Sequence, residues 1–152
     1  MGGKGRNMLA NQSSEVRIHW REMLDEAQFV RPSFLARRSD MFVILSSKSI
    51  LRLLKNVPIT CVGERLDNGK IRFTMPDFDP TISAEHTDNF QALNLLAVQV
   101  METAERWYEG TQKGDAHFDR QEKFPLLMKI LSLERPMDLA RIMKVEWVST
   151  DN

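Results

Sequence analysis

The 152-residue sequence contains a single cysteine, Cys61, and no apolar run that approaches the length of a membrane span. One cysteine cannot form a disulfide within the chain, so we expect a reducing compartment. The first ten residues lack the apolar core of a signal peptide, which makes the cytoplasm the expected location and gives no reason to expect a membrane partner. The formal net charge is zero. Any contact with DNA must therefore come from a local basic patch.

The sequence also lacks a recognisable set of catalytic or metal-binding residues. Cys61 has no cysteine partner nearby and lies in a predicted strand, where a small core residue is expected. Asp77 and Asp79 are flanked by prolines, which is typical of an ordinary loop and not of a metal site. No phosphate-binding loop or nucleophile motif occurs. The histidines show no metal-ligand spacing; they are His19, expected on the surface, His86 and His117. We therefore expect neither an enzyme, nor a metal, nor a cofactor.

The central stretch, Pro58 to Gly110, predicts a hairpin followed by a long helix. Residues 59–66 favour a strand, and Asp67-Asn68-Gly69-Lys70 is a hairpin turn signal, because Asn-Gly tolerates positive φ angles. Ile71, Phe73 and Met75 alternate with polar residues, as in a half-buried second strand. Thr81 to Ala84 predicts a short third strand. A helix is then predicted from Thr87 to about Tyr108, and its apolar stripe should pack on the hairpin. The stripe consists of Phe90, Leu93, Ala97, Val100, Met101, Ala104, Trp107 and Tyr108.

This stretch resembles the HicB-like antitoxin domain, a partial RNase H fold. The matching residues are Met75-Pro76-Asp77-Phe78 after the hairpin and Thr87-Asp88-Asn89-Phe90-Gln91-Ala92-Leu93 at the helix start. The resemblance implies a Thr-capped helix on an antiparallel sheet. It also implies a scaffold that has lost the catalytic carboxylates of its parent fold.

The N-terminal part of the chain predicts a helix, a hairpin and a second helix. Ser13 or Ser14 can cap the first helix, whose apolar positions are Val16, Trp20, Met23, Leu24 and Ala27. Two short extended runs, Phe34 to Ala36 and Met41 to Leu45, flank the polar turn Arg37 to Asp40. Ser46 can cap the second helix, which should end near Asn56. Its apolar positions are Ile50, Leu51, Leu53 and Leu54.

This part resembles the N-terminal module of Phd/YefM-type antitoxins. The matching residues are Ser14-Glu15-Val16-Arg17, Met23-Leu24-Asp25-Glu26, Ala36-Arg37-Arg38 and Val43-Ile44-Leu45-Ser46. The resemblance implies a dimer in which Arg17 and Arg37 contact operator DNA. Arg38 shares the hairpin tip with Arg37, and an arginine presents a rigid fork of donors suited to phosphates and guanine edges. From the residues alone, solvated surface charges are an equally good interpretation of the three arginines.

The C-terminal part predicts two helices and a final strand. Pro125 fits the first turn of a helix that carries Leu126, Leu127, Ile130, Leu131 and Leu133. Pro136 interrupts it, and Met137 to Lys144 predicts a second helix with Leu139, Ile142 and Met143 inward. Val145 to Val148 predicts a strand. These helices either complete the core, which we favour, or wrap a partner protein.

Together these features predict an α+β fold, in which a helix–hairpin–helix module precedes a HicB-like antiparallel sheet with a long packed helix and C-terminal helices. The expected segments are a disordered tail (1–12), a dimerisation and DNA-binding module (13–56), a HicB-like domain (57–110) and a helical extension (111–152). The resemblances imply an antitoxin of the RelB-like group. Its partners would be its own copy, operator DNA and a RelE- or HicA-type ribonuclease toxin, covered through acidic segments such as 77–79 and 102–109. The alternative is a small-ligand-binding or orphan interaction module without a toxin.

Overall fold

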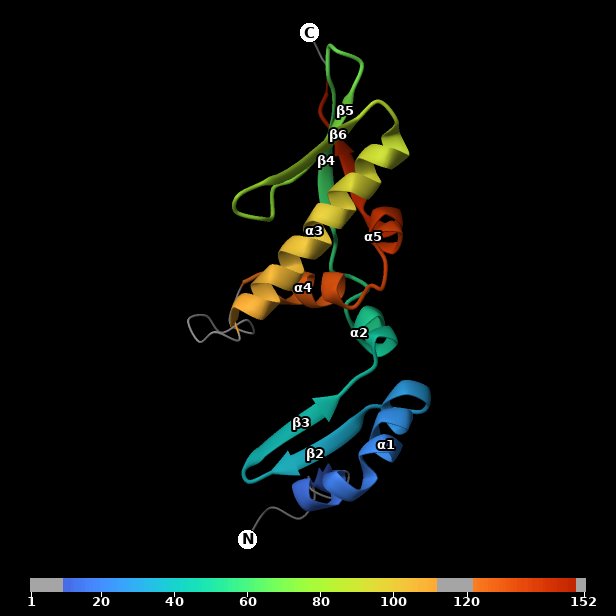
Figure 1. Cartoon of the computed structure of the whole chain (residues 1–152), viewed down its shortest axis with the longest axis vertical. Coiled ribbons are helices and arrows are strands. Elements are labelled where there is room, and N and C mark those ends of the chain that lie inside the picture. Colours follow the sequence, from blue (N-terminus) through green and yellow to red (C-terminus); the bar gives the residue numbers. More distant parts are fainter. Residues whose placement is uncertain (1–9, 112–121, 150–152) are drawn as a thin grey trace. The chain divides into compact units, whose positions relative to one another are not determined.

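The computed structural model describes residues 10–111 and 122–149, in which five helices and two sheets form an α+β fold, as predicted (Figure 1). The chain divides into two compact units, Met1–Leu53 and Leu54–Asn152. The connector predicted from Gly110 to Asp119 lies almost wholly outside the described residues. The two units are described separately below.

The N-terminal unit contains β1 (Ala10–Gln12), α1 (Ser13–Phe29), β2 (Ser33–Arg37), β3 (Asp40–Ile44) and α2 (Ser47–Leu53). Its sheet has the order β1-β2-β3, with β1 parallel and β3 antiparallel to β2. The prediction of a disordered tail through residue 12 differs from this structure. Ala10 pairs with Phe34, and a parallel pair between segments on either side of a helix leaves no local pattern in the sequence.

The hairpin and second helix of this unit follow the predicted local chemistry. Arg37 pairs with Asp40, so Arg38 and Ser39 make the turn, and Arg38 has a left-handed φ of 56°. Ser46 caps α2, because its Oγ accepts the backbone N–H of Ser49 at 3.2 Å. The Ser46 cap is thus confirmed.

The C-terminal unit is built on a sheet with the order β6-β5-β4-β7. Its strands are β4 (Thr60–Arg65), β5 (Ile71–Met75), β6 (Ile82–His86) and β7 (Lys144–Trp147). The predicted Asn-Gly turn joins β4 to β5: Gly69 has a φ of 79°, and the Asn68 side chain accepts the Lys70 N–H at 3.0 Å. The predicted last strand is present, but it runs parallel to β4, so the sheet is mixed and not purely antiparallel.

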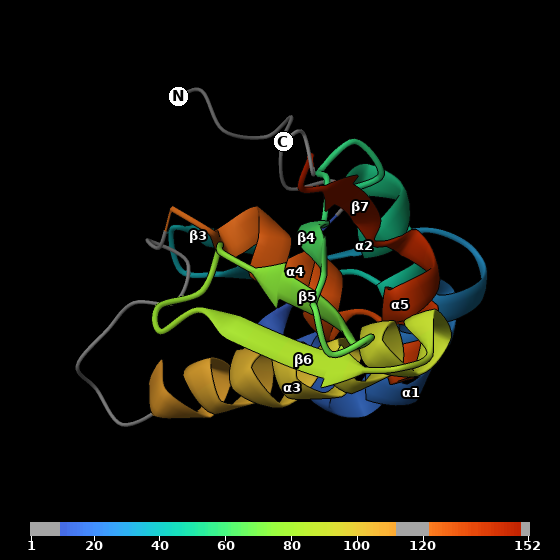
Figure 2. The same cartoon turned by 90° about the horizontal axis from the view of Figure 1, so that it is seen from above.

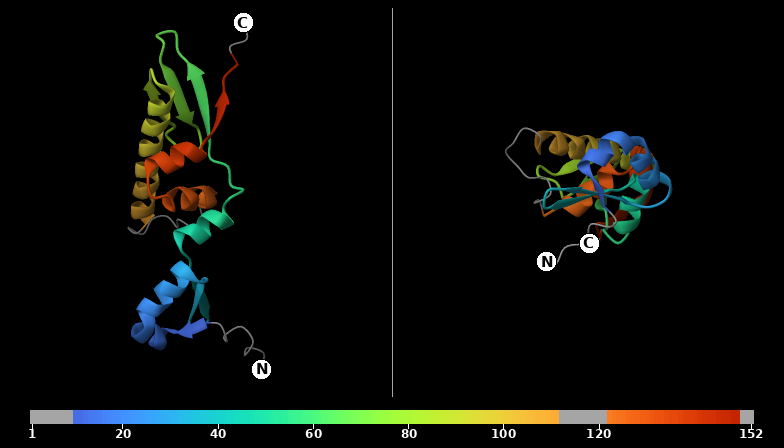
Figure 3. Two further views of the ribbon diagram at one scale, coloured as in Figure 1. Left: turned by 90° about the vertical axis from the view of Figure 1, so that its right-hand side faces the viewer. Right: turned by 90° about the horizontal axis from the view of Figure 1, so that it is seen from below.

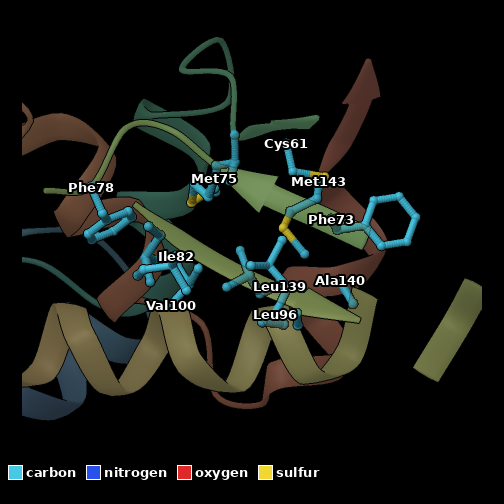
Figure 4. Close-up of a cluster of buried hydrophobic side chains, with 14 of the residues drawn as sticks. Cys61, Phe73, Met75, Phe78, Ile82, Leu96, Val100, Leu139, Ala140 and Met143 are labelled. Carbon is cyan, nitrogen blue, oxygen red and sulfur yellow. The ribbon is translucent and has the colours of Figure 1, made fainter. Parts of the chain in front are cut away.

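Three helices complete the core of this unit; the longest lies along the sheet, and the two shorter ones pack against it (Figure 3). They are α3 (Asn89–Thr111), α4 (Phe124–Leu131) and α5 (Pro136–Ile142). Figure 4 shows the core between them and the strands, with Val100 of α3 beside Ile82 and Leu96 of α3 beside Leu139. Leu127, Ile130 and Leu139 are fully buried in the same core. Packing of the C-terminal helices, the interpretation we favoured from sequence, is therefore confirmed.

Several boundaries and facings in this unit differ from the sequence predictions. Asp88, not Thr87, caps α3, since its Oδ1 accepts the Gln91 N–H at 2.8 Å. The strand before it extends to His86, whose Nδ1 accepts the Asp88 N–H at 2.9 Å. Phe90 and Tyr108, predicted inward, are about half exposed, as is Ile142 of α5. The buried stripe of α3 instead includes two residues that we left out, Ala92 and Leu96.

Candidate interaction surfaces

The predicted DNA-contacting arginines lie in the N-terminal unit. Arg37 ends β2 and Arg38 forms the adjacent turn, and both side chains are exposed. Arg38 has a left-handed backbone conformation, which non-glycine residues seldom adopt. The tight turn at the hairpin tip therefore exposes two neighbouring arginines. Arg17 lies in α1, but its side chain is outside the described part of the chain. The structure therefore brings together Arg37 and Arg38 and leaves the position of the Arg17 side chain open.

The same unit has a very small core. Among its described side chains, the buried apolar residues are Met23, Ala27 and Ala36. Trp20 and Leu24, which we predicted to face inward, are 49% and 42% exposed. Residues this large and apolar are exposed in numbers only where another surface covers them or function requires it.

Strand β3 exposes three consecutive apolar side chains. It lies at the edge of the three-stranded sheet, so in the described residues one side of its backbone has no strand partner. Met41, Phe42 and Val43 are 42%, 48% and 46% exposed, which means that both faces of the strand are open. Such an edge is a template for pairing with another chain. The sequence placed this strand but not its exposure, because an edge strand and a covered strand have the same apolar pattern.

A polar network holds α1 to the start of β2. The Arg31 Nε donates to Glu26 Oε1 at 2.8 Å, and the buried Ser33 hydroxyl donates to the Met23 carbonyl at 3.0 Å. Ser33 Oγ also lies 3.3 Å from Glu26 Oε2. The hydrogen bond from Arg31 lowers the pKa of Glu26, with smaller help from the Arg31 charge and from Ser33 against a desolvation cost. This network shapes the link between helix and hairpin, which the sequence did not predict.

Among the described residues, none of the groups considered for catalysis forms a reactive set. Cys61 is fully buried, and burial raises the pKa of its thiol to about 11, so it is a core residue as predicted. Within the described residues, no three carboxylate, histidine or cysteine side chains gather as metal ligands would, and Asp77 and Asp79 lie in the loop between β5 and β6. His19 is exposed in α1 beside Glu22, with Nδ1 3.1 Å from a carboxylate oxygen. His117 is outside the described residues.

The sheet face turned away from the helices carries polar and charged side chains. Arg72 in β5 donates from Nε to Glu85 Oε1 at 2.7 Å and lies 3.7 Å from Glu64 Oε2. These three residues form a charged ladder across β4, β5 and β6. An open, polar sheet face is ordinary for antiparallel sheets, so this ladder alone does not mark a binding site.

Two surface concavities flank this sheet. The first, of about 550 Å³, lies between the start of β6 and the C-terminal half of α3; its lining includes Asp79, Ile82, Ser83, Gln99, Arg106 and Trp107. The second, of about 750 Å³, lies where β4 begins; its lining includes Val57, Thr60, Val62, Asp77, Pro125 and Glu146. Lys129 donates to the Val57 carbonyl at 2.6 Å near this second concavity. Neither concavity could be predicted from the sequence, because each joins segments far apart in the chain.

Comparison with known proteins places the fold. No protein-family model and no curated protein matches the sequence. The structure is similar to a crystal structure from Syntrophomonas wolfei subsp. wolfei, that of the antitoxin part of a proposed toxin/antitoxin system. The TM-score is 0.74, with 19% sequence identity, and the match covers 93% of this chain and 100% of that chain. At this identity the likeness establishes a shared fold.

Within residues 10–111 and 122–149, no helix combines the length and apolarity that crossing a bilayer requires. The surfaces that stand out in the described residues are the β3 edge with its arginine tip and the concavity beside β6.

Proposed function

We propose that this protein is the antitoxin of a type II toxin–antitoxin system. The observation that carries the proposal is the fold likeness to an antitoxin over 93% of this chain. The Phd/YefM-like and HicB-like resemblances of the two halves point the same way, and the strand order β6-β5-β4-β7 with a long helix on one face supports the second of them. The N-terminal unit would pair with its own copy and bind operator DNA. The C-terminal unit would bind the toxin.

The exposed apolar residues of the N-terminal unit support self-association. Trp20, Leu24, Met41, Phe42 and Val43 are each more than two fifths exposed. A second copy would cover them and pair the open edge of β3, and a two-fold arrangement is the commonest way to do so. A dimer would also double the arginine tips, as recognition of two DNA half-sites requires.

Replacement of the arginine tip tests the DNA-binding part of the proposal. Each arginine that contacts phosphate or a base edge is worth about 1–3 kcal/mol, so Arg37→Ala with Arg38→Ala should reduce operator binding by roughly a hundredfold or more. It should also make the salt dependence shallower, by roughly 0.9 in the logarithmic slope for each lost phosphate contact. A gel shift with the DNA upstream of the gene measures both. Arg52→Ala, an exposed arginine of α2 in the same unit, is the matched control and should leave binding unchanged.

Co-expression with the neighbouring gene product tests the toxin-binding part. We propose a small ribonuclease of the RelE or HicA type, whose basic RNA-binding surface the antitoxin covers. Expressed alone, that protein should stop growth; expressed with this chain, it should be tolerated and should co-purify with it. Growth arrest that the full chain does not relieve would contradict the proposal.

The alternative, a small-ligand sensor without a toxin, would need an enclosed apolar site. The two concavities beside the sheet are instead lined in part by charged side chains, including Asp79 and Arg106 in one and Asp77 and Glu146 in the other. Small-molecule sites are mostly apolar, so these concavities favour a macromolecular partner.

A further inference from the structure

Strand β6 leaves a row of backbone groups without a partner in the described part of the chain. It is an edge strand, because only β5 pairs with it. The Lys144 and Val148 amides donate to the Ile59 and Gly63 carbonyls, so the odd-numbered residues of β4 face β7 and its even-numbered residues face β5. The same alternation passes through the antiparallel pairs from β4 to β5 and from β5 to β6. As a result, the backbone groups of Ile82, Ala84 and His86 bond to β5. Ser83 and Glu85 therefore direct their N–H and C=O groups outward.

A groove runs beside this free edge. Figure 2 shows β6 lying along α3, and the concavity of about 550 Å³ is bounded by Ile82 and Ser83 on the strand side and by Gln99, Thr103 and Trp107 on the helix side. The Trp107 ring packs against the Phe78 ring, with ring centroids 5.2 Å apart. An edge strand with a helix across a groove is the geometry in which proteins accept an extended peptide as an added strand.

Acidic side chains predominate around the groove. Asp79 and Glu102 line it. A further hollow, of about 370 Å³ and distinct from the second concavity, continues along α3 with Glu102, Glu105 and Glu109. Among the described residues that line the two hollows, the single basic one, Arg106, is turned back onto its own helix, where it donates to the Glu102 carbonyl at 3.3 Å and to Thr103 Oγ1 at 3.2 Å. The field along this path therefore attracts cations.

We propose that the groove between β6 and α3 binds an extended, basic peptide segment that adds to the sheet as a strand beside β6. The Ser83 and Glu85 backbone groups would pair with the peptide, and the carboxylates of Asp79, Glu102, Glu105 and Glu109 would select lysine or arginine side chains. The inference rests on the proposed function in one respect: the natural source of the segment is the basic toxin. The second concavity lies over β4 and is lined by the other edge strand, β7, only through Glu146, so it carries no such argument.

Hydrogen exchange of the full-length protein with a probe peptide tests the pairing directly. The probe is a fluorescent peptide of about seven alternating lysines and valines, the length of a typical strand. It should bind saturably with a Kd below about 100 µM. Binding should slow exchange of the outward Ser83 and Glu85 amides, while the Ala84 amide, already paired with β5, should change little. The same peptide N-methylated at alternate residues should bind at least about tenfold more weakly, because it lacks the donors that pair with the edge.

Two substitutions locate the site without relying on the probe chemistry. Ser83→Pro removes an outward N–H and leaves the β5 ladder intact, so it should abolish binding, whereas Ser83→Ala should not. Glu102→Lys should weaken binding, and Glu134→Lys, an exposed glutamate of the same unit, should not, although both change the net charge equally. A circular dichroism spectrum and melting curve equal to those of the parent show that each variant is folded. If Ser83→Pro does not fold, the N-methylated peptide and the Glu102 pair still decide.

Three results would overturn the inference: no saturable binding, equal binding of the N-methylated peptide, or protection of Ser83 and Glu85 that rises with protein concentration in the absence of peptide. The last would mean that a second copy occupies the edge. Toxin neutralisation by the parent chain is a separate measurement. These results can therefore contradict peptide binding at the groove while the antitoxin proposal stands. Conversely, peptide binding at this groove without neutralisation would uphold the groove and contradict the proposed function.

Discussion

The two units of this protein differ in how completely each buries its own apolar side chains. The C-terminal unit packs four strands and three helices around one continuous core, in which Phe73, Leu96, Leu127 and Leu139 are fully buried. The N-terminal unit buries only Met23, Ala27 and Ala36 among its described apolar side chains and leaves Trp20, Phe29 and Phe42 about half exposed or more.

Burial of apolar side chains, and not apolar composition, therefore distinguishes a self-sufficient unit from one that needs a partner. A unit of about fifty residues buries a smaller share of its surface than one twice as long, so its stability is marginal unless something else covers it. We therefore expect the C-terminal unit to be stable at any concentration. The N-terminal unit should gain its stability from association.

The largest expected effect comes from the core of the C-terminal unit. Phe73→Ala should lower the free energy of unfolding by about 3–5 kcal/mol, because it removes a fully buried ring and leaves a cavity in the core. Urea denaturation followed by circular dichroism and tryptophan emission measures this, and the Trp147 ring lies 5.5 Å from that of Phe73. Phe90→Ala, on the exposed side of α3, is the control and should cost less than about 1 kcal/mol. Equal effects of Phe73→Ala and Phe90→Ala would contradict the difference in burial between the two side chains.

The next effect concerns the N-terminal unit. Phe42→Asp should weaken self-association by about 2 kcal/mol or more, roughly thirtyfold, because it places a charge in the apolar surface that a second copy covers. Sedimentation equilibrium measures the dissociation constant. Val148→Asp is the control, since Val148 is similarly exposed, at 51% against 48%, but belongs to the other unit. A parent chain that stays monomeric at all concentrations would show that the exposed apolar surface has another purpose.

A smaller effect is expected at the close approach between β4 and β7. A Cβ on Gly63 would lie 2.9 Å from ring atoms of both Phe73 and Trp147, so Gly63→Ala must displace an aromatic ring and should cost about 1–3 kcal/mol. Thermal unfolding measures the loss. Gly110→Ala in α3 meets nothing within 4 Å and should be neutral or stabilising by up to about 1 kcal/mol. Destabilisation by both would point to a general cost of alanine and not to crowding.

The smallest effect is a pH dependence confined to the N-terminal unit. The pKa of Glu26 is lowered by Arg31, so its ionised form stabilises the folded state above about pH 4.5, and this contribution is lost as the pH falls through the lowered pKa. Glu26→Gln should therefore destabilise the unit at pH 7 and make less difference at pH 3. Exchange protection of α1 amides at the two pH values measures it. Arg31→Ala should reproduce the effect, and a pH-independent difference would contradict it.

Local features of the fold could be predicted from sequence because their causes are local. The Ser46 cap, the Asn68-Gly69 turn and the prolines at the starts of α4 and α5 each act within a few residues. Errors arose where two local signals compete. Thr87 and Asp88 both cap helices well, and the structure uses Asp88 because β6 extends to His86.

Features that depend on distant segments could not be predicted. The apolar residues of α1 and β3 have the spacing of a core, and only the absence of a covering layer makes Trp20 and Phe42 a candidate interface. The groove beside β6 requires the strand order and the direction of α3 together. Arg37 and Arg38 were predicted at a hairpin tip, where the structure places them, but their use in DNA binding stays a prediction.

The parallel pair between β4 and β7 has a consequence for synthesis. Thr60 lies opposite Lys144, so more than eighty further residues must be synthesised after β4 begins before β7 can pair with it. Until then the Ile59 and Gly63 carbonyls lack the amides of Lys144 and Val148. Chains whose synthesis stops before Lys144 should therefore leave the ribosome with an incomplete sheet and be degraded by proteases.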